Sequence, residues 1–277
     1  MNKVSIYIPC YNGTEYLKKC LDSVLKQAYP AQEIIVVDDG SEDEIADALA
    51  GYPVKLIRHS RNAGIAAARN SAISNAKEDF IASVDVDCLL DTDWLGQCMS
   101  NFMDPKIAAV GGKLVEDRVD KTEYRWRAMH LKQHWGDQRI VNPLCLSGSN
   151  TVIRKSAFNE VGLYNEKRFK KNYEDVDMCL RLKKNGFNLI YEPKAIARHI
   201  KTETPASVLH TFWRWKLHDY TCAPRHTPFF IFYLVNLVKV LAKDIINGRL
   251  EFISMDILNF PLSAYFGVKK ILKNDRG

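Results

Sequence analysis

Apolar and polar positions alternate along the first hundred residues in a way that predicts strands and helices in turn. Short, strongly apolar runs are typical of buried strands, and the segments between them repeat apolar residues every three or four positions, as one helix face requires. The predicted strands are Val4–Ile8, Glu33–Val37, Val54–Ile57 and Phe80–Val84; the predicted helices are Glu15–Gln27, a short acidic helix after Ser41, and Ala63–Ala76. This alternation favours an α/β fold with a mostly parallel sheet and helices on both faces.

Polar clusters follow three of these strands. They are Pro9-Cys10-Tyr11-Asn12, Asp38-Asp39-Gly40-Ser41 and Asp85-Val86-Asp87. Ligands of such sheets bind beyond the carboxyl ends of the strands, so clusters far apart in sequence can meet in one crevice. We therefore expect a single site at this edge of the sheet.

The second half of the chain has a weaker pattern. A stretch after Gly112 that contains Trp126 and Trp135 indicates a helix and a loop. Beyond it the pattern predicts a strand at Thr151–Arg154 and a helix from Glu174 to about Asn185, which ends before Gly186. A strand at Asn188–Tyr191 and a loop to His199 follow. We expect an α/β domain over residues 1–204 and a helical C-terminal extension over residues 205–277.

Charge is concentrated in that extension. The chain has 277 residues and a net charge of +6, and residues 205–277 hold ten Lys and Arg against five Asp and Glu. They also hold 12 of the 29 aromatic residues. A basic, aromatic segment suits an anionic membrane surface better than a nucleic acid, and no zinc-finger or RNP-like motif is present. We expect no nucleic-acid partner; the rival idea of a basic nucleic-acid binder rests on charge alone.

The extension contains the longest apolar run, Phe229–Ala242, which Asn236 and Lys239 interrupt. It is too short to span a bilayer, which takes about 20 residues. Asn236, Lys239, Lys243 and Asn247 form a polar stripe on an otherwise apolar helix. Two interpretations stay open: the helix packs on the catalytic domain, or it lies flat in a membrane interface.

The cysteines and the N-terminus indicate a cytoplasmic protein. Seven cysteines are scattered without a CxxC pair, and the first residues have too short an apolar run for an export signal. We expect reduced thiols and a location in the cytoplasm, at the inner face of the cytoplasmic membrane.

Asp85 and Asp87 are the main candidates for chemistry. Two unpaired carboxylates at a strand end cannot both enter an apolar core, but both can face one site. Carboxylate oxygens bind Mg²⁺ or Mn²⁺, which also take phosphate oxygens and neutralise a diphosphate leaving group. The alternative is a polar loop that caps a helix.

Four further candidates each have a structural alternative. Asp39 either forms a turn or accepts hydrogen bonds from a ribose or base. Arg69 either pairs with a structural acid or binds a phosphate. Glu174 and Asp175 either cap a helix or supply a general base. His199 is either an ordinary polar residue or a neutral metal ligand.

Taken in order, these segments resemble family 2 glycosyltransferases of the GT-A fold. The resembling segments are Ser5–Asn12, Val36–Ser41, Asn62–Asn70, Asp85–Asp87, Gly148–Asn150, Glu174-Asp175 and His199. Together they cover about residues 4–200, and the full ordered series is far more specific than any one motif.

The resemblance implies an inverting transfer of a sugar from a nucleotide-diphosphate sugar, most simply a UDP-sugar, to an acceptor hydroxyl. It implies that Asp175 is the base with Glu174 beside it, and that Asp85, Asp87 and His199 bind Mn²⁺ or Mg²⁺. It further implies that the donor contacts Pro9, Tyr11, Asn12, Glu15, Asp39, Arg69 and Asp85. The acceptor is expected to be a saccharide or lipid-linked saccharide of cell-surface polysaccharide or lipid-linked oligosaccharide synthesis.

One segment departs from the family pattern. Processive synthases carry Gln-x-x-Arg-Trp before membrane-spanning helices, whereas this chain has Thr211-Phe-Trp-Arg-Trp215 and no spanning run after it. This departure argues against a processive, secreting synthase. Arg214 then either borders the donor site or belongs to an ordinary amphipathic helix.

Two rivals share the expected fold. A sugar-phosphate nucleotidyltransferase would need a Gly-rich, basic loop after the first strand, and Pro-Cys-Tyr-Asn-Gly-Thr does not fit that pattern. A catalytically inactive nucleotide-sugar-binding or scaffold protein would be expected to have lost an aspartate, but Asp39, Asp85, Asp87 and Asp175 are all present.

Overall fold

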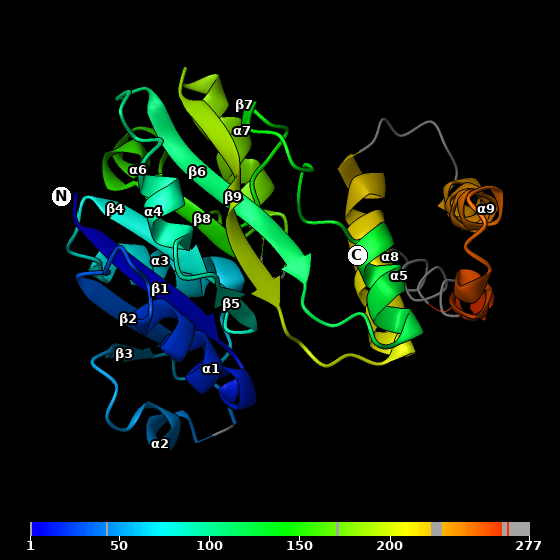
Figure 1. Ribbon diagram of the computed structural model, residues 1–277, viewed down its shortest axis with the longest axis horizontal. Coiled ribbons are helices and arrows are strands. Elements are labelled where there is room, and N and C mark those ends of the chain that lie inside the picture. The colour runs from blue at the N-terminus through cyan, green and yellow to red at the C-terminus, as the bar shows by residue number, and fades with distance from the viewer. Residues whose placement is uncertain (1, 43, 170–171, 223–228, 262–264, 266–277) are drawn as a thin grey trace. The chain divides into compact units, whose positions relative to one another are not determined.

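A computed structural model describes residues 2–42, 44–169, 172–222, 229–261 and 265 of the chain (Figure 1). The chain divides into two compact units. The first comprises residues 1–117 and 133–201, and the second comprises residues 118–132 and 202–277.

A nine-stranded sheet, counted over the described residues, forms the centre of the first unit. Its strands are β1 (Val4–Cys10), β2 (Glu33–Asp38), β3 (Lys55–Arg58), β4 (Phe80–Val84), β5 (Cys88–Leu90), β6 (Ile107–Glu116), β7 (Ile140–Val141), β8 (Asn150–Arg154) and β9 (Asn188–His199). Their order is β3-β2-β1-β4-β8-β6-β9-β5, with β7 paired to β9. Strands β1 to β4 pair in parallel, whereas β8 runs antiparallel to both β4 and β6.

Helices cover both faces of this sheet (Figure 1). They are α1 (Thr14–Leu25), α2 (Ile45–Leu49), α3 (Ile65–Asn75), α4 (Trp94–Met99), α6 (Lys155–Val161) and α7 (Glu174–Lys184). One core packs α1, α2 and α4 against the sheet, and a second core packs α3, α6 and α7 against the opposite face. Successive strand residues point to opposite faces, so Ile6 and Ile8 join the first core and Tyr7 the second. The α/β fold expected from the alternation is confirmed.

Strand β9 corrects one expectation. The predicted strand ended at Tyr191 with a loop before His199, but β9 continues to His199, its last residue. Pro193 lacks an N–H and interrupts the strand pattern in sequence, which hid the second half of β9. The pairing with β6 shifts register here, from Gly112 opposite Glu192 to Lys113 opposite Ile196. A β-bulge therefore carries the strand past the proline.

The second unit is helical. It contains α5 (Thr122–His130), α8 (Pro205–Cys222), α9 (Phe229–Ile246) and the short 3₁₀ helix Leu250–Phe252. Its core includes Trp126, Trp213, Tyr233, Leu237 and Phe252. The predicted boundary at residue 204 leaves α5 in the first domain, whereas the structure places residues 118–132 with the C-terminal helices. Trp126 explains this placement: it is fully buried, and its Nε1 donates to Asp256 Oδ1 at 2.9 Å.

The structure also shows the lengths of the apolar helices and the state of the cysteines. Among the described residues, no helix combines the length and the apolar character needed to cross a membrane. Six cysteines are free thiols (Cys10, Cys20, Cys88, Cys98, Cys145 and Cys179). The side chain of Cys222 and the tail cations Arg225, Lys269, Lys270, Lys273 and Arg276 lie outside the described residues.

Candidate active site

The loops that follow β1 and β2 hydrogen-bond to each other at the carboxyl edge of the sheet. The backbone N–H of Asn12 donates to Ser41 Oγ at 3.0 Å, and the N–H of Glu42 donates to Asn12 Oδ1 at 2.9 Å. Asn12 has a φ of +48°, which Asn tolerates better than most residues. Pro9 is buried in β1, and Tyr11 is exposed beside it. The predicted donor residues of β1 thus lie together at this edge.

The carboxylate of Asp39 is largely engaged within the protein. It accepts hydrogen bonds from the backbone N–H groups of Ala63 and Gly64 at 2.9 and 2.8 Å, and Oδ1 lies 2.7 Å from Nδ1 of His59. A carboxylate has about four acceptor positions, so these contacts leave one for a ligand. The same loop needs Gly40, which has a φ of +73° and whose added Cβ would lie 2.4 Å from the backbone of Arg61. His59 was not predicted, because no motif separates it from other surface histidines.

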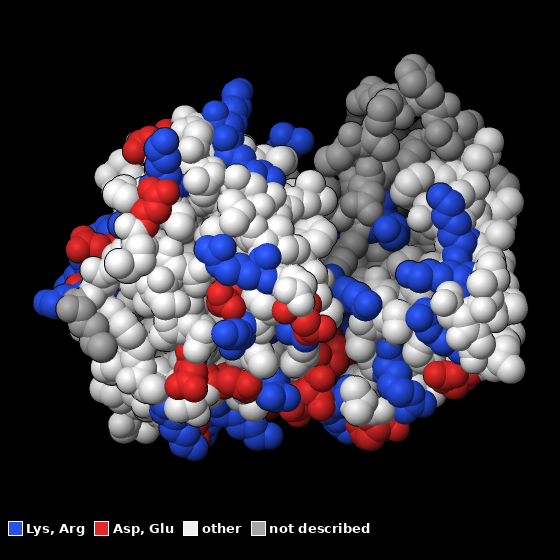
Figure 2. Space-filling model, turned by 45° about the horizontal axis from the view of Figure 1, so that its top comes forward, with Lys and Arg blue, Asp and Glu red and all other residues white. Residues whose placement is uncertain are grey.

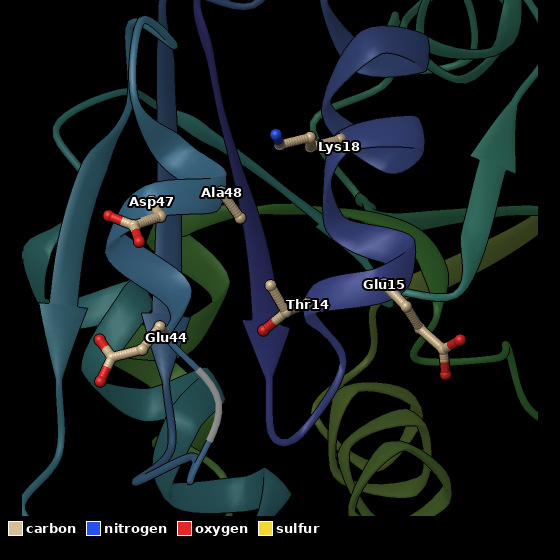
Figure 3. A pocket seen from close by; sticks show the side chains of 6 residues that line it. All are labelled: Thr14, Glu15, Lys18, Glu44, Asp47 and Ala48. Carbon is tan, nitrogen blue, oxygen red and sulfur yellow. The ribbon is translucent and has the colours of Figure 1, made fainter.

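Glu15 lies apart from the aspartates. It is exposed in the first turn of α1 and lines a hollow of about 390 Å³ between α1 and α2 (Figure 3). Its side chain points to the side opposite Glu44 and Asp47 (Figure 3). Three acids and one lysine line this hollow, so its charge would repel a diphosphate.

Arg69 is the centre of a buried polar network. It extends from α3 with a side chain that is 3% exposed. Its Nη2 lies 3.1 Å from Asp85 Oδ1, and its Nε lies 3.2 Å from Glu174 Oε1. Nη1 donates to Gly148 O at 2.6 Å, to Tyr7 OH at 3.3 Å and to Ser83 Oγ. Burial opposes the charge of Arg69, but Tyr7, Asp85 and Glu174 hold its pKa well above the ordinary value. The structural interpretation of Arg69 is therefore met: it pairs with acids.

Glu174 and Asp175 begin α7 but differ in environment. Glu174 is 4% exposed, and burial together with the charge of Asp175 raises its pKa to about 7, against the opposing effect of Arg69. Asp175 is only half-buried. Its Oδ2 accepts a hydrogen bond from the N–H of Gly148 at 2.9 Å, and its Oδ1 accepts one from Val176 at 2.8 Å. Asp175 is thus the carboxylate of this pair that a substrate can reach.

Gly148 allows the two halves of this network to approach. A Cβ at position 148 would lie 2.8 Å from Arg69 Nη2 and 3.2 Å from Asp175 Cβ. The residue therefore has to be small, because its N–H contacts Asp175 while its carbonyl contacts Arg69. The Gly148-Ser-Asn motif thus links the arginine to the accessible carboxylate.

Asp87 and His199 face each other at the end of β9. Asp87 Oδ2 lies 3.5 Å from His199 Nε2, and the N–H of Ile200 donates to Asp87 O at 2.9 Å. On the other side of the ring, His199 Nδ1 lies 2.8 Å from Glu116 Oε2. A carboxylate on Nδ1 fixes the imidazole so that Nε2 is directed to a ligand. Glu116 was not predicted, since it lies 83 residues from His199 in the chain.

The residues fit a cation that shares its coordination with a substrate. Within the described part of the chain, no group of three or more His, Cys, Asp or Glu side chains is arranged to hold a metal ion by itself. Mg²⁺ is usually held by one or two carboxylates plus substrate phosphates and water. Asp87, with His199 oriented by Glu116 and Asp85 nearby in sequence, offers such a partial set.

Arg214 lies on α8 in the second unit and is half-buried. Its role at the donor stays a prediction.

Comparison with known proteins identifies the family. Residues 5–162 match the family model described as Glycosyl transferase family 2. The chain belongs to this family. It is 26% identical over 261 residues to poly-beta-1,6-N-acetyl-D-glucosamine synthase of Staphylococcus aureus (strain COL), a match that covers 86% of this chain and 62% of the relative. It is 27% identical over 224 residues to the synthase of the same name from Staphylococcus epidermidis, covering 76% of this chain and 53% of that protein. The chain thus spans less than two thirds of these relatives.

Solved structures share the GT-A fold of this chain. The mannosyltransferase PcManGT from Pyrobaculum calidifontis, in complex with GDP-Man and Mn²⁺, has a TM-score of 0.62 at 18% identity, covering 98% of this chain and 80% of that one. GalNAc-T7 with UDP, GalNAc and Mn²⁺ has a TM-score of 0.59 at 19% identity, covering 73% of this chain and 44% of that one. TarS 1–349 of S. aureus has a TM-score of 0.56 at 22% identity, covering 78% of this chain and 65% of that one.

Proposed function

We propose that this chain is an inverting, metal-dependent glycosyltransferase that moves a sugar from a UDP-sugar to an acceptor hydroxyl. One observation carries the proposal. The first unit holds an accessible carboxylate, Asp175, and a separate group of polar side chains around Asp87 and His199. Inverting displacement needs one base and one stabilised leaving group, rather than two carboxylates flanking a glycosidic bond as in hydrolases. The family membership supports the same reaction class.

Asp175 would take the proton of the acceptor hydroxyl. As the acceptor oxygen forms its bond to the anomeric carbon, the bond from that carbon to the diphosphate oxygen breaks on the opposite face. The electron pair leaves with the nucleoside diphosphate, and the configuration inverts. The N–H groups of Gly148 and Val176 each donate to one oxygen of Asp175 and so fix the direction of its carboxylate.

Asp87, Asp85 and His199 would hold Mn²⁺ or Mg²⁺, which neutralises charge on the departing diphosphate. Glu116 would keep the proton of His199 on Nδ1, so that the lone pair of Nε2 is presented to the metal. Arg69 would act mainly through Asp85, by holding that carboxylate in place from within the protein. Two of the similar structures contain Mn²⁺, which supports the choice of metal.

The donor's nucleoside would lie over the carboxyl ends of β1 and β2. Pro9, Tyr11 and Asn12 supply the wall after β1, and Asp39 supplies its remaining acceptor position to the base or ribose. Donor contacts by Glu15 and Arg214 stay predictions from the family resemblance. The similarity to poly-beta-1,6-N-acetyl-D-glucosamine synthases supports N-acetylglucosamine as the sugar and a polysaccharide as the acceptor; a lipid-linked saccharide is the alternative acceptor.

The C-terminal unit supplies a surface for the cytoplasmic membrane. Helix α9 exposes large apolar residues at helical spacing, each at least 41% exposed: Ile231, Leu234, Val235, Val238, Ile245 and Ile246. Lys239 and Lys243 are also exposed on this helix. Figure 2 shows Lys and Arg interspersed with uncharged surface over this unit. Apolar residues flanked by cations suit the interface of an anionic membrane, so we place the enzyme at its inner face.

Vesicle binding tests this placement. The protein is expected to co-sediment with phosphatidylglycerol vesicles at moderate salt, and Val238→Glu should weaken that binding. Met103→Glu is the matched control, because Met103 is an exposed apolar residue of the first unit. Equal binding by wild type and Val238→Glu would remove α9 from the interface.

A thermal-shift panel tests the reaction class. UDP-, GDP- and dTDP-sugars are compared with and without Mn²⁺, followed by measurement of released nucleoside diphosphate. We expect a metal-dependent shift with UDP-sugars that Asp87→Ala abolishes. No shift and no release with any donor would favour the catalytically inactive scaffold instead.

A further inference from the structure

A short segment before β7 is held in place at several points. Gln133 Nε2 donates to Ser147 Oγ at 3.1 Å, and Trp135 Nε1 donates to the carbonyl of Cys145 at 2.8 Å. The buried Tyr191 donates its hydroxyl to Gly136 O at 2.7 Å. An ion pair between Lys113 and Asp137 fixes the end of the segment. The backbone and the indole ring of Trp135 therefore have a defined position.

Trp135 nevertheless exposes much of its ring. It is 42% exposed, whereas Trp94, Trp126 and Trp213 are fully buried and Trp215 is partly buried. A single apolar residue on a surface is ordinary. Here, however, the polar N–H is already satisfied, and the hydrogen bond restricts the ring to one orientation. What remains for solvent is a rigid aromatic surface.

This surface lies close to Asp175. Trp135 bonds to residue 145, and Gly148, three residues further along, donates its N–H to Asp175. Three residues of chain span at most ~11 Å. The thiol of Cys145 gives a second indication that this loop lies near Asp175. Burial raises the pKa of Cys145 to about 11, and the charge of Asp175 is the next cause of this rise. The distance between the Trp135 ring and the Asp175 carboxylate is therefore short enough for one saccharide to contact both.

We propose that Trp135 is the platform on which a pyranose ring of the acceptor saccharide stacks beside Asp175. One face of a pyranose presents several C–H groups, which pack against the electron-rich face of an indole while the hydroxyls stay hydrated. Such stacking would orient the acceptor hydroxyl toward the base. The assignment rests on the proposed transferase function, and it adds the acceptor subsite to it.

Kinetics of two substitutions test the platform. Wild type, Trp135→Leu and Trp135→Tyr are assayed with UDP-N-acetylglucosamine, Mn²⁺ and β-1,6-linked N-acetylglucosamine oligosaccharides as acceptor. We expect Trp135→Leu to raise the acceptor KM on the order of tenfold, with a smaller change in kcat and in the donor KM, and Trp135→Tyr to restore most of the loss. Leu144→Ala, an exposed residue of the same loop, is the control and should behave as wild type. An unchanged acceptor KM in Trp135→Leu would overturn the proposal.

Fluorescence quenching gives a readout that does not need turnover. Because Trp135 is the most exposed of the five tryptophans, acrylamide should quench it first. The β-1,6-linked trisaccharide should protect wild type from acrylamide and should not protect Trp135→Phe. Equal protection in both proteins, or none in wild type, would refute the platform. Protection without any release of nucleoside diphosphate would instead keep the platform and refute the proposed transfer.

Discussion

Two neighbouring carboxylates at the start of α7 have opposite surroundings. Glu174 is 4% exposed and lies 3.2 Å from the guanidinium of Arg69. Asp175 is half-buried and holds the N–H of Gly148. Both residues are carboxylic acids and follow each other in sequence, so the fold alone separates their tasks. Glu174 stabilises a buried cation, and Asp175 is left for a substrate.

The same contrast extends across the site. On the side of Arg69, one buried cation is surrounded by Asp85, Glu174, Ser83 and the carbonyl of Gly148. On the side of His199, Asp87 and Glu116 flank an imidazole from opposite edges. The first arrangement balances a cation with acids of the protein, whereas the second pairs one imidazole with two acids and can take a cation. We therefore assign rigidity to the residues around Arg69 and ligand binding to the residues around His199.

Asp175→Asn should have the largest effect of these substitutions, because it removes the proposed base and keeps the shape of the site. We expect the transfer rate to fall by about 10² to 10⁴, the usual contribution of a general base. Donor binding by thermal shift should survive. Asp177→Asn is the matched control, since Asp177 lies in the same helix turn and pairs with Arg181. A rate for Asp175→Asn as high as that of Asp177→Asn would show that Asp175 is not the base.

Arg69→Met tests the buried side. Removing the buried guanidinium takes the ion-pair partner from Asp85 and Glu174, so at pH 8, where Glu174 is ionised, we expect a loss of about 3–5 kcal/mol in the free energy of unfolding, measured by urea titration. Arg198→Met provides the comparison, because Arg198 and Asp91 form an exposed pair whose loss should cost about 0–1 kcal/mol. Similar losses for the two variants would mean that the buried cluster contributes no more than a surface pair.

Glu174→Gln tests the difference between the two carboxylates through the pH dependence of stability. The pKa of Glu174 is about 7 in the folded chain against 4.5 as the ordinary value, so the folded state keeps a proton that the unfolded state has released. The free energy of unfolding should therefore fall as pH rises from 4.5 to 7, by about 3 kcal/mol in all. Gln cannot ionise, so the variant should lack this part of the slope.

Urea titrations of both proteins between pH 4.5 and 8 measure the difference directly. Other titrating groups contribute to both curves and cancel in the subtraction. Parallel curves for wild type and Glu174→Gln would show that Glu174 does not hold its proton in the folded state.

The local pattern predicts the parallel half of the sheet and the motif residues at its edge. Strands β1, β2 and β4 are each mainly apolar, and a polar cluster follows each of them. Because parallel strands end at the same edge, their polar ends could be placed together without coordinates. Asp87 and His199 could likewise be paired, since their family motif carries both.

Contacts between residues that are far apart in the chain cannot be predicted from the local sequence pattern. Glu116 meets His199 only because β6 and β9 pair in register, and His59 meets Asp39 because the loops after β2 and β3 adjoin. Helix α5 joins the C-terminal unit through the contact of Trp126 with Asp256, 130 residues away. Such placements depend on packing, which neither spacing nor periodicity encodes.

Glu116→Ala and Glu116→Gln test the other side of the contrast with the smallest expected effect. Ala removes the acceptor of the His199 Nδ1–H, whereas Gln keeps an acceptor and loses only the charge. Loss of such a partner typically lowers metal affinity 10- to 100-fold, so Glu116→Ala should weaken Mn²⁺ binding by about that factor, and Glu116→Gln by less. Mn²⁺ titration in the presence of UDP, followed by electron paramagnetic resonance, measures both. Asp117→Asn removes the same charge from the adjacent exposed residue and should leave the affinity unchanged. If Asp117→Asn and Glu116→Ala weakened Mn²⁺ equally, the effect would come from net charge and not from the orientation of His199.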